Sequence, residues 1–284
     1  MSVRRVGRVV PGQDTSDGAG VRLRRSLGGS QLNQLDPFLL LDEFKSDDSN
    51  DYIAGFPDHP HRGFETVTYM LAGVMQHKDS RGNEGELTGG GVQWMTAWRG
   101  ITHSEMPRQT DGLMWGFQLW VNLPASDKMR EPRYQDIAAD DVPEVVTGDG
   151  GRLLVVAGEA GGASGPVTGI VTQPLYVDVA LEEGGRLSQP VPLGHNAFVY
   201  VFDGDVELGG DAESDRQIVS SGHLAVLEEG DEVRARAAGG GPARFLLVAA
   251  KPIGEPVARY GPFVMNTREE IAQAVEDFKE GRLA

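Results

Sequence analysis

Short β-type runs, separated by glycine and proline, constrain the fold of this chain more than any other sequence feature. The 284 residues include 39 glycines and 16 prolines, which supply the turns. Runs of β-forming residues recur at 66–71, 92–96, 115–123, 153–157, 175–181, 197–202, 223–227 and 244–249. Many short strands of this kind are typical of sandwiches and barrels rather than of βαβ units. The sequence therefore predicts an all-β protein.

Two of these segments show the strand signal in detail. In residues 175–181, leucine and valine alternate with other residues, the period of a strand that is buried on one face. Farther along the chain, Asp203-Gly204 separates two β-type runs. Asp-Gly in this position predicts a β-hairpin.

Only the C-terminus has the pattern of a helix. Thr267-Arg-Glu-Glu270 is a capping box, in which each end residue can bond the backbone amide of the other. Gly281 is a plausible terminator. An apolar stripe with helical spacing follows the box, at Ile271, Val275 and Phe278. We expect a structural helix that packs on a barrel.

The length allows two domains of ordinary size. A stretch with three prolines among charged residues, at 124–150, marks the expected boundary and ends in Gly148-Asp-Gly-Gly151. We therefore divide the chain into residues 1–130 and residues 131–284.

Composition excludes several classes of protein. The chain has no cysteine, which excludes disulfides, thiolate catalysis and cysteine-type zinc sites. It has no apolar run long enough to span a membrane, and its basic N-terminus lacks the apolar stretch of a signal peptide. These features favour a cytoplasmic location. The formal charge of −16 argues against direct nucleic-acid binding, which needs lysine and arginine to neutralise phosphates.

One local exception to the acidic character lies at the N-terminus. Six arginines crowd the first 25 residues, at Arg4, Arg5, Arg8, Arg22, Arg24 and Arg25. They form either a solvated face of early strands or a docking patch for an acidic partner.

Metal-binding residue types are concentrated in two short segments, 55–65 and 94–107. His59 and His61 are two residues apart, as are His103 and Glu105. Residues i and i+2 of a strand project to the same face, so two such pairs on neighbouring strands would direct four ligands into one space. Pro60 cannot donate to a strand ladder and belongs at a sheet edge or a barrel mouth.

The ligand types favour a catalytic metal over a structural one. Imidazole and carboxylate bind divalent transition metals, whereas a structural zinc site usually contains cysteine. An octahedral ion with four protein ligands keeps two positions open. Histidines with one carboxylate and open positions are typical of non-haem Fe(II) oxygenases, which favours iron; nickel, copper, zinc or manganese could take its place.

Three segments resemble the pirin family of the cupin superfamily. Residues 56–69 are similar to the pirin signature, residues 93–97 and 100–107 to its second half, and residues 251–267 with the following helix to the pirin C-terminus. The resemblance implies a bicupin, two facing β-barrels of the double-stranded β-helix type. The barrel of residues 1–130 would bind the metal. The barrel of residues 131–284 would lack one and include the closing C-terminal segment and helix.

The resemblance also implies the ligand set His59, His61, His103 and Glu105. This differs from the usual cupin scheme, where the carboxylate follows the histidine pair. Glu65 occupies that usual place and is the rival fourth ligand; otherwise it supports the ligands or packs beside them. His77 could form a hydrogen bond in the same pocket or could be an exposed turn residue.

Other conspicuous residues have ordinary structural interpretations. His195 and His223 lack a second histidine two positions away and are expected at strand ends. Trp94 and Trp98 are expected in the core.

The resemblance implies one principal function. Bacterial pirins resemble quercetinases, which open the central ring of flavonols with O₂ and release carbon monoxide. Glu105 would then take the proton of the substrate hydroxyl. The predicted function is thus a metal-dependent dioxygenase whose partners are O₂ and a small aromatic substrate of the quercetin type.

Two alternatives stay open. Some pirins are regarded as regulators that dock on proteins and sense the redox state of the metal, which would make this chain a non-enzymatic binding protein with a protein partner. Cupin barrels also host isomerases and hydrolases, because a fold does not determine one reaction.

Overall fold

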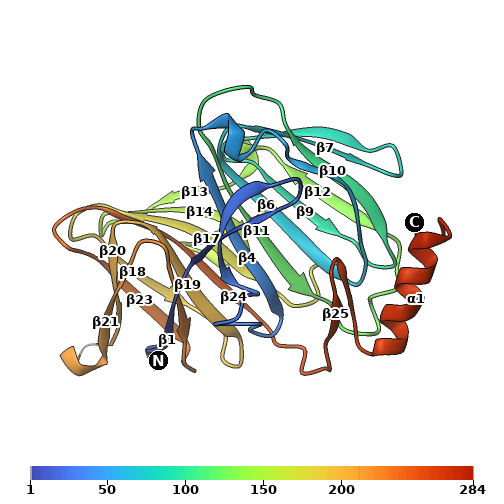
Figure 1. The fold of residues 1–284 in the computed structure, drawn as a ribbon. Coiled ribbons are helices and arrows are strands. Elements are labelled where there is room, and N and C mark those ends of the chain that lie inside the picture. The colour runs from blue at the N-terminus through green and yellow to red at the C-terminus, as the bar shows by residue number, and fades with distance from the viewer. Residues whose placement is uncertain (1, 211, 284) are drawn as a thin grey trace. The chain divides into compact units, whose positions relative to one another are not determined.

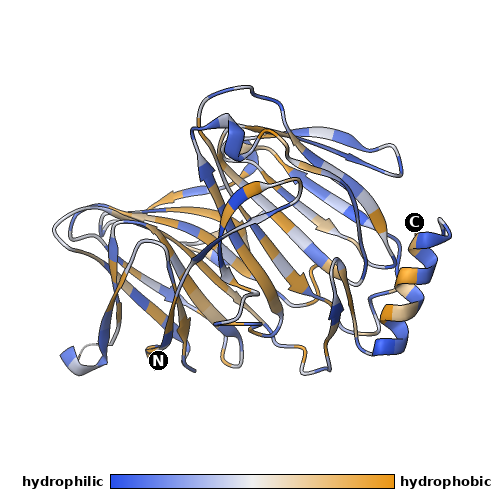
Figure 2. Ribbon diagram, viewed as in Figure 1, coloured by the Kyte–Doolittle hydropathy of each residue, from blue (hydrophilic) through white to orange (hydrophobic). Residues whose placement is uncertain are grey.

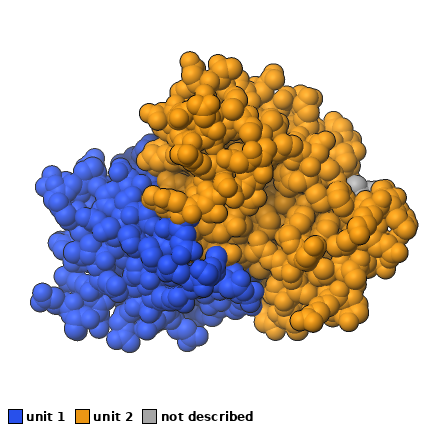
Figure 3. All heavy atoms as spheres, in the orientation of Figure 1, with its two compact units in different colours: residues 1–13, 29–37, 141–252 blue, residues 14–28, 38–140, 253–284 orange. Residues whose placement is uncertain are grey.

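The computed structural model describes residues 2–210 and 212–283. The chain divides into two compact units, each made of three segments (Figure 3). Unit 1 contains residues 1–13, 29–37 and 141–252, and unit 2 contains residues 14–28, 38–140 and 253–284. The domain bounds 1–130 and 131–284, which were assigned from the sequence, stay a prediction.

Unit 2 contains a seven-stranded sheet, a four-stranded sheet, a hairpin and a helix (Figure 1). The large sheet has the order β12-β9-β6-β11-β4-β3-β2, with β2 Gln13–Asp17, β3 Val21–Leu27, β4 Phe38–Ser46, β6 Phe64–Ala72, β9 Val92–Thr96, β11 Met114–Asn122 and β12 Arg133–Ile137. The small sheet has the order β5-β10-β7-β8, with β5 Phe56–His61, β7 Val74–Asp79, β8 Glu84–Thr88 and β10 Ile101–Pro107. The hairpin is β25 Ala258–Tyr260 with β26 Phe263–Met265, and the helix is α1 Arg268–Lys279.

Unit 1 repeats this plan. Its large sheet has the order β1-β22-β19-β24-β17-β14-β13, with β1 Val6–Pro11, β13 Glu144–Val146, β14 Gly151–Ala157, β17 Leu175–Leu181, β19 Asn196–Asp203, β22 His223–Leu227 and β24 Ala243–Ala250. Its small sheet has the order β18-β23-β20-β21, with β18 Arg186–Pro190, β20 Asp205–Gly209, β21 Arg216–Ser220 and β23 Glu232–Ala238. A short hairpin joins β15 Glu159–Ala160 and β16 Ala163–Ser164. Three 3₁₀ turns, at Ser49–Asp51, Ala139–Asp141 and Glu213–Asp215, complete the described elements.

The all-β class is confirmed, and each of the eight predicted runs overlaps a strand. Two predictions about individual segments are wrong. Strand β17 is buried on both faces, because Tyr176 is covered and Asp178 is buried in a two-pronged ion pair with Arg244, at 3.0 and 2.6 Å. Asp203-Gly204 does not form a hairpin, since β19 and β20 belong to different sheets. Gly204 has a φ of +67°, and the turn carries the chain from one sheet to the other.

The interiors of the two units differ in chemistry. Figure 2 shows apolar residues along the strands and hydrophilic residues in the loops. In unit 1 a large apolar core joins both sheets, with Val177, Val199, Val206 and Phe245 among its members. In unit 2 buried polar side chains accompany the apolar clusters, and they include His61, Thr68, Gln93, Thr96, His103 and Glu105. Among the described residues, three of the four buried histidines lie in unit 2.

The C-terminal helix is confirmed with its predicted cap. The Thr267 hydroxyl accepts the Glu270 amide at 3.2 Å, and the Glu270 carboxylate accepts the Thr267 amide at 2.9 Å. The apolar stripe packs against β26, where the Phe278 ring lies 6.2 Å from that of Phe263. Helix α1 thus belongs to unit 2, although it lies at the far end of the sequence.

Among the described residues, no helix has the length and apolar character needed to cross a bilayer. The cytoplasmic location stays a prediction.

Candidate metal centre

Two neighbouring strands carry the predicted ligand pairs. Strand β5 pairs with β10 in antiparallel register, with His103 opposite His59. Strand β5 is an end strand in the order of its sheet, as the proline between the two histidines requires. A register shift between His103 and Glu105 then places Glu105 opposite Phe56. The local sequence therefore brings both pairs to one place, with an irregularity beside the carboxylate.

The three histidines form a compact cluster. One ring nitrogen from each of His59, His61 and His103 lies within 4.8 Å of the other two. The ring centroids are 4.6 Å apart for His59 and His61, 4.5 Å for His59 and His103, and 5.0 Å for His61 and His103. Three imidazoles that converge in this way can share one ion of the size that histidine binds at ~2.0–2.1 Å.

The electrostatics of the cluster suit a metal ligand. Burial, together with the neighbouring histidines, lowers the pKa of His61 and of His103 well below the usual value. Both rings are therefore neutral at pH 7, the form that binds metals. Both ring nitrogens of His103 and the Nδ1 atom of His61 are buried without a hydrogen-bond partner among the described residues. Because orphaned buried nitrogens are costly, they indicate that an ion belongs here.

Glu105 lies beside the cluster, and its carboxylate is held by two neighbours. Its Oε1 atom accepts a hydrogen bond from the Thr68 hydroxyl at 2.7 Å. The Gln118 amide donates more weakly to both carboxylate oxygens, at 3.5 and 3.4 Å. Glu105 as a fourth ligand stays a prediction that requires the side chain to turn toward the histidines.

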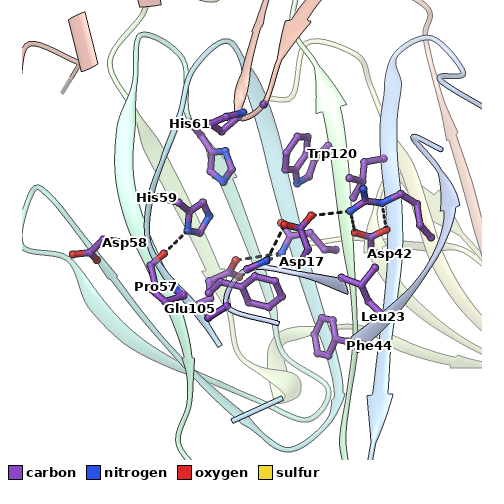
Figure 4. A pocket seen from close by; sticks show the side chains of 18 of the residues that line it. Asp17, Leu23, Asp42, Phe44, Pro57, Asp58, His59, His61, Glu105 and Trp120 are labelled. Carbon is purple, nitrogen blue, oxygen red and sulfur yellow. Dashed lines mark hydrogen bonds and ion pairs between the residues drawn. The ribbon is translucent and has the colours of Figure 1, made fainter. Parts of the chain in front are cut away.

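A cavity of about 620 Å³ opens onto the site (Figure 4). His59, His61 and Glu105 form one part of its lining, with Trp120 and Asp42 across from them. Most of the remaining lining is apolar, with Leu23, Leu40, Phe44 and Phe56. A volume of this size and an apolar lining with a few polar groups are typical of sites for small organic molecules.

Glu65, the rival ligand, lies outside the histidine cluster. It is buried on β6, and its Oε1 atom accepts a hydrogen bond from Thr96 on the neighbouring strand at 2.8 Å. Burial raises the pKa of Glu65 to about 7. Its supporting or packing role stays a prediction.

His77 is not an exposed turn residue; that alternative is wrong. It is buried on β7, directly across from Glu105 in the antiparallel register of β7 and β10. Its Nδ1 atom bonds the Gln93 amide, and its ring stacks on Tyr134 with centroids 6.0 Å apart. As cross-strand partners, His77 and Glu105 share one face of the sheet, which fits the predicted supporting role without testing it.

The remaining histidines and tryptophans lie apart from the site. His223 begins β22, and His195 directly precedes β19, as expected of strand-end residues. Within residues 2–210 and 212–283, the three histidines described above form the one group suited to a metal. Trp94 is fully buried, and Trp98 is partly buried in a loop; neither lines the cavity.

The C-terminal segment supports the strand that carries His61. The guanidinium of Arg62, the next residue, is buried and pairs with Asp277 of α1 at 2.7 Å. The Arg62 amide donates to the Pro262 carbonyl at 3.3 Å, and its own carbonyl accepts the Val264 amide at 3.0 Å. Buried Lys128 bonds the carbonyls of Gly63 and Val264, at 2.6 and 3.0 Å. Histidine ligands commonly depend on such supporting contacts for their orientation.

Sequence reasoning missed three contributors to the site, namely Thr68, Gln118 and Trp120. Gln118 and Trp120 are two residues apart in a predicted strand and therefore share a face, which is a signal that could have found them. Thr68 has no comparable signal, because its contact with Glu105 joins residues 37 positions apart.

Comparisons with known proteins agree with this architecture. The family model of pirin matches residues 20–121, and the model of the pirin C-terminal cupin domain matches residues 176–284. A pirin-like protein of Caulobacter vibrioides is 50% identical over 283 residues, which are 99% of this chain and 100% of the relative. Human pirin is 45% identical over 282 residues, with 99% and 94% covered.

A solved structure gives the same result. The crystal structure of quercetin 2,3-dioxygenase from Acinetobacter baumannii superimposes with a TM-score of 0.89 at 34% identity, and covers 100% of this chain and 99% of that protein. Sequence models, relatives and fold agree along almost the whole chain, and the chain belongs to the pirin family of cupin proteins.

Proposed function

We propose that this chain is a metal-dependent dioxygenase acting on a flavonol-type aromatic substrate. The observation that carries the proposal is the cluster of three imidazoles, those of His61 and His103 buried, beside an apolar cavity. The Acinetobacter baumannii structure, similar over the whole chain, bears the name quercetin 2,3-dioxygenase and supports the same reaction class.

His59, His61 and His103 would hold the metal, with Glu105 as the fourth ligand. Iron(II) is the metal we propose; nickel, copper, zinc and manganese are the alternatives, because affinity alone does not select among them. A redox-active ion held there would supply Lewis acidity toward a substrate hydroxyl and the electron chemistry that reactions with O₂ require.

Residues of the chain itself orient the substrate and move its proton. The apolar lining excludes water from the aromatic rings, and Trp120 offers a flat surface beside His61, with ring centroids 5.4 Å apart. Glu105 accepts hydrogen bonds through both oxygens, which fix the orientation of its side chain. A carboxylate at this edge of the cavity is suited to take the proton of a substrate hydroxyl.

Elemental analysis of the purified protein, combined with O₂ uptake and loss of the flavonol absorption band, tests the proposal. His61→Ala should lose most of the bound metal, at least ~10–100-fold in affinity. The matched control His223→Ala removes a histidine outside the cluster and should keep it. Metal content near that of the wild type in His61→Ala would exclude the site.

Glu105→Gln separates binding from chemistry. We expect this variant to retain some metal and to lose flavonol turnover, because an amide cannot accept the proton. Full turnover in Glu105→Gln would refute its role as a base. A metal-loaded wild type that leaves a panel of flavonols unchanged would refute the dioxygenase itself.

The N-terminal arginines give little support to the regulatory alternative. Arg4 is buried and donates to the carbonyls of Pro192 and Glu228 at 3.1 and 3.2 Å. Four of the others form ion pairs with acids: Arg5 with Asp215 and Glu228, Arg22 with Asp51, Arg24 with Asp14, and Arg25 with Asp17 and Asp42. A docking role for these arginines stays a prediction without a structural observation in its favour.

A further inference from the structure

The cavity has a charged end in addition to its metal end. Asp17, Arg25, Asp42 and Arg259 all line it. Arg25 donates to both carboxylate oxygens of Asp42, at 2.8 and 2.7 Å, and to Asp17 at 2.8 Å. Asp17 and Asp42 therefore share Arg25 as their hydrogen-bonded cation.

Arg259 lines the same cavity, but its contacts differ from those of Arg25. Its guanidinium lies over the ring of Trp120, 4.8 Å from the centroid, and its Nη1 atom donates to the Leu39 carbonyl at 3.2 Å. No carboxylate of the described residues forms an ion pair with it. Desolvation, followed by the neighbouring Arg25, lowers the pKa of Arg259 from its usual value, whereas Asp42 and Asp17 act in the opposite direction.

Trp120 connects this cation to the metal end. The guanidinium lies over the indole ring, and the ring of His61 packs edge-on against the same indole with centroids 5.4 Å apart. Arg259 and the His61 ring are thus separated by at most on the order of 10 Å, the total of the two distances measured from the same indole. A fused aromatic ligand that reaches the histidines and lies along Trp120 brings its far end to Arg259.

Asp42 and Asp17 act on Arg259 electrostatically but form no ion pair with it, and the two other acids of the cavity are directed elsewhere. Glu105 is at the metal end, where Thr68 and Gln118 hold it. The carboxylate of Asp58 points away from the cavity in Figure 4. Arg259 is exposed, rests on an aromatic ring and forms no ion pair with a described residue, so its guanidinium can bond an anionic group of a ligand directly.

We propose that Arg259 selects substrates that carry a carboxylate at the end remote from the metal. The preferred substrate class is then an aromatic acid with a metal-binding hydroxyl at one end and an acidic group at the other. The metal end of this assignment rests on the proposed function; the acid end rests on Arg259 and Trp120.

A matched pair of ligands tests the proposal. 3-Hydroxyflavone-4′-carboxylate and its methyl ester differ in charge at the remote end only. Their binding to zinc-loaded protein without O₂ can be measured by quenching of tryptophan fluorescence, because Trp120 lines the cavity and the proposed reaction requires O₂. We expect the wild type to bind the acid about tenfold more tightly than the ester, the usual scale of one charge-assisted hydrogen bond.

Three variants and the salt dependence isolate the cause. Arg259→Gln should bring the affinity ratio to about one and leave ester binding intact, whereas Arg259→Lys should retain part of the preference. Arg22→Gln removes the same charge from an exposed arginine paired with Asp51, outside the cavity, and should keep the full ratio. In the wild type, raising the salt from about 0.05 to about 0.5 M should weaken acid binding and not ester binding.

The outcomes separate this inference from the proposed function. A wild type with no preference for the acid, or an unchanged preference in Arg259→Gln, overturns the role of Arg259 even where iron-loaded protein consumes flavonols. An acid preference that depends on Arg259, in a protein that consumes neither ligand with any metal, supports the inference and refutes the dioxygenase.

Discussion

The ion pair between Arg62 and Asp277 should contribute measurably to the stability of unit 2. Arg62 is only 4% exposed and Asp277 is 17% exposed, with 2.7 Å between Nη1 and Oδ2. Removal of one partner from a buried pair costs ~3–5 kcal/mol, because the other charge is left buried. Asparagine can still accept one hydrogen bond, and Asp277 is partly accessible. We therefore expect Asp277→Asn to cost about 2–3 kcal/mol, or ~5–10 °C in melting temperature.

Tryptophan fluorescence during urea unfolding is suited to this measurement. The chain has four tryptophans, Trp94, Trp98, Trp115 and Trp120, and all of them belong to unit 2. The emission therefore reports the unfolding of the unit that contains the ion pair. Asp14→Asn is the matched control, because Asp14 is 86% exposed and pairs with Arg24 at 3.2 Å. It should cost at most ~1 kcal/mol.

The pH dependence gives a second check with a defined sign. The Arg62 guanidinium, followed by the Gln273 amide, lowers the pKa of Asp277 below its usual value. A lowered carboxyl pKa stabilises the folded state above the pKa of the unfolded chain, and this contribution is lost as the pH falls through the folded pKa. The difference between the wild type and Asp277→Asn should thus shrink between about pH 5 and pH 3. Equal stability of Asp277→Asn and Asp14→Asn at pH 7 would refute the reasoning.

Two further predictions concern residues near the histidines. The pKa of Glu65 is raised to about 7, so the stability of metal-free protein should fall as the pH rises from about 4.5 through 7, by on the order of 3 kcal/mol. Glu65→Gln should remove this slope in urea unfolding at pH 5 and pH 8; identical slopes would show that Glu65 ionises freely. Gly63 has a φ of +87°, and a Cβ there would collide with the Val264 carbonyl. Gly63→Ala should cost ~1–3 kcal/mol and weaken metal binding, whereas Gly82→Ala, which has a similar φ and open space, should cost only the backbone strain; equal losses would exclude the collision.

Local signals made much of the fold predictable. The run Val92–Thr96 was delimited by sequence alone, and the capping box placed the start of α1, because both depend on residues close together in the chain. The Asp203-Gly204 turn failed as a hairpin for the opposite reason. Its local geometry is compatible with either outcome, and the pairing of β19 with β22 and β24 rather than with β20 depends on distant strands.

The candidate site shows the same limit. The spacing of the histidines predicted that they would meet, since alternate residues of a strand share a face. The spacing did not predict that Arg259 and Pro262, more than 190 positions later, line the same cavity as His59 and His61. No periodicity in either segment indicates that contact, which arises from the return of the C-terminal hairpin to unit 2.

The three-segment construction of unit 2 has a consequence for synthesis of the protein. The four candidate ligand residues are made first, whereas Pro262, Val264 and Asp277, which hold the neighbour of His61, follow more than 150 residues after the last of them. A nascent chain therefore carries every candidate ligand long before the strand that presents them has its full support. A truncation before Pro262 would spare all four candidate ligands and still remove part of the scaffold of the metal centre.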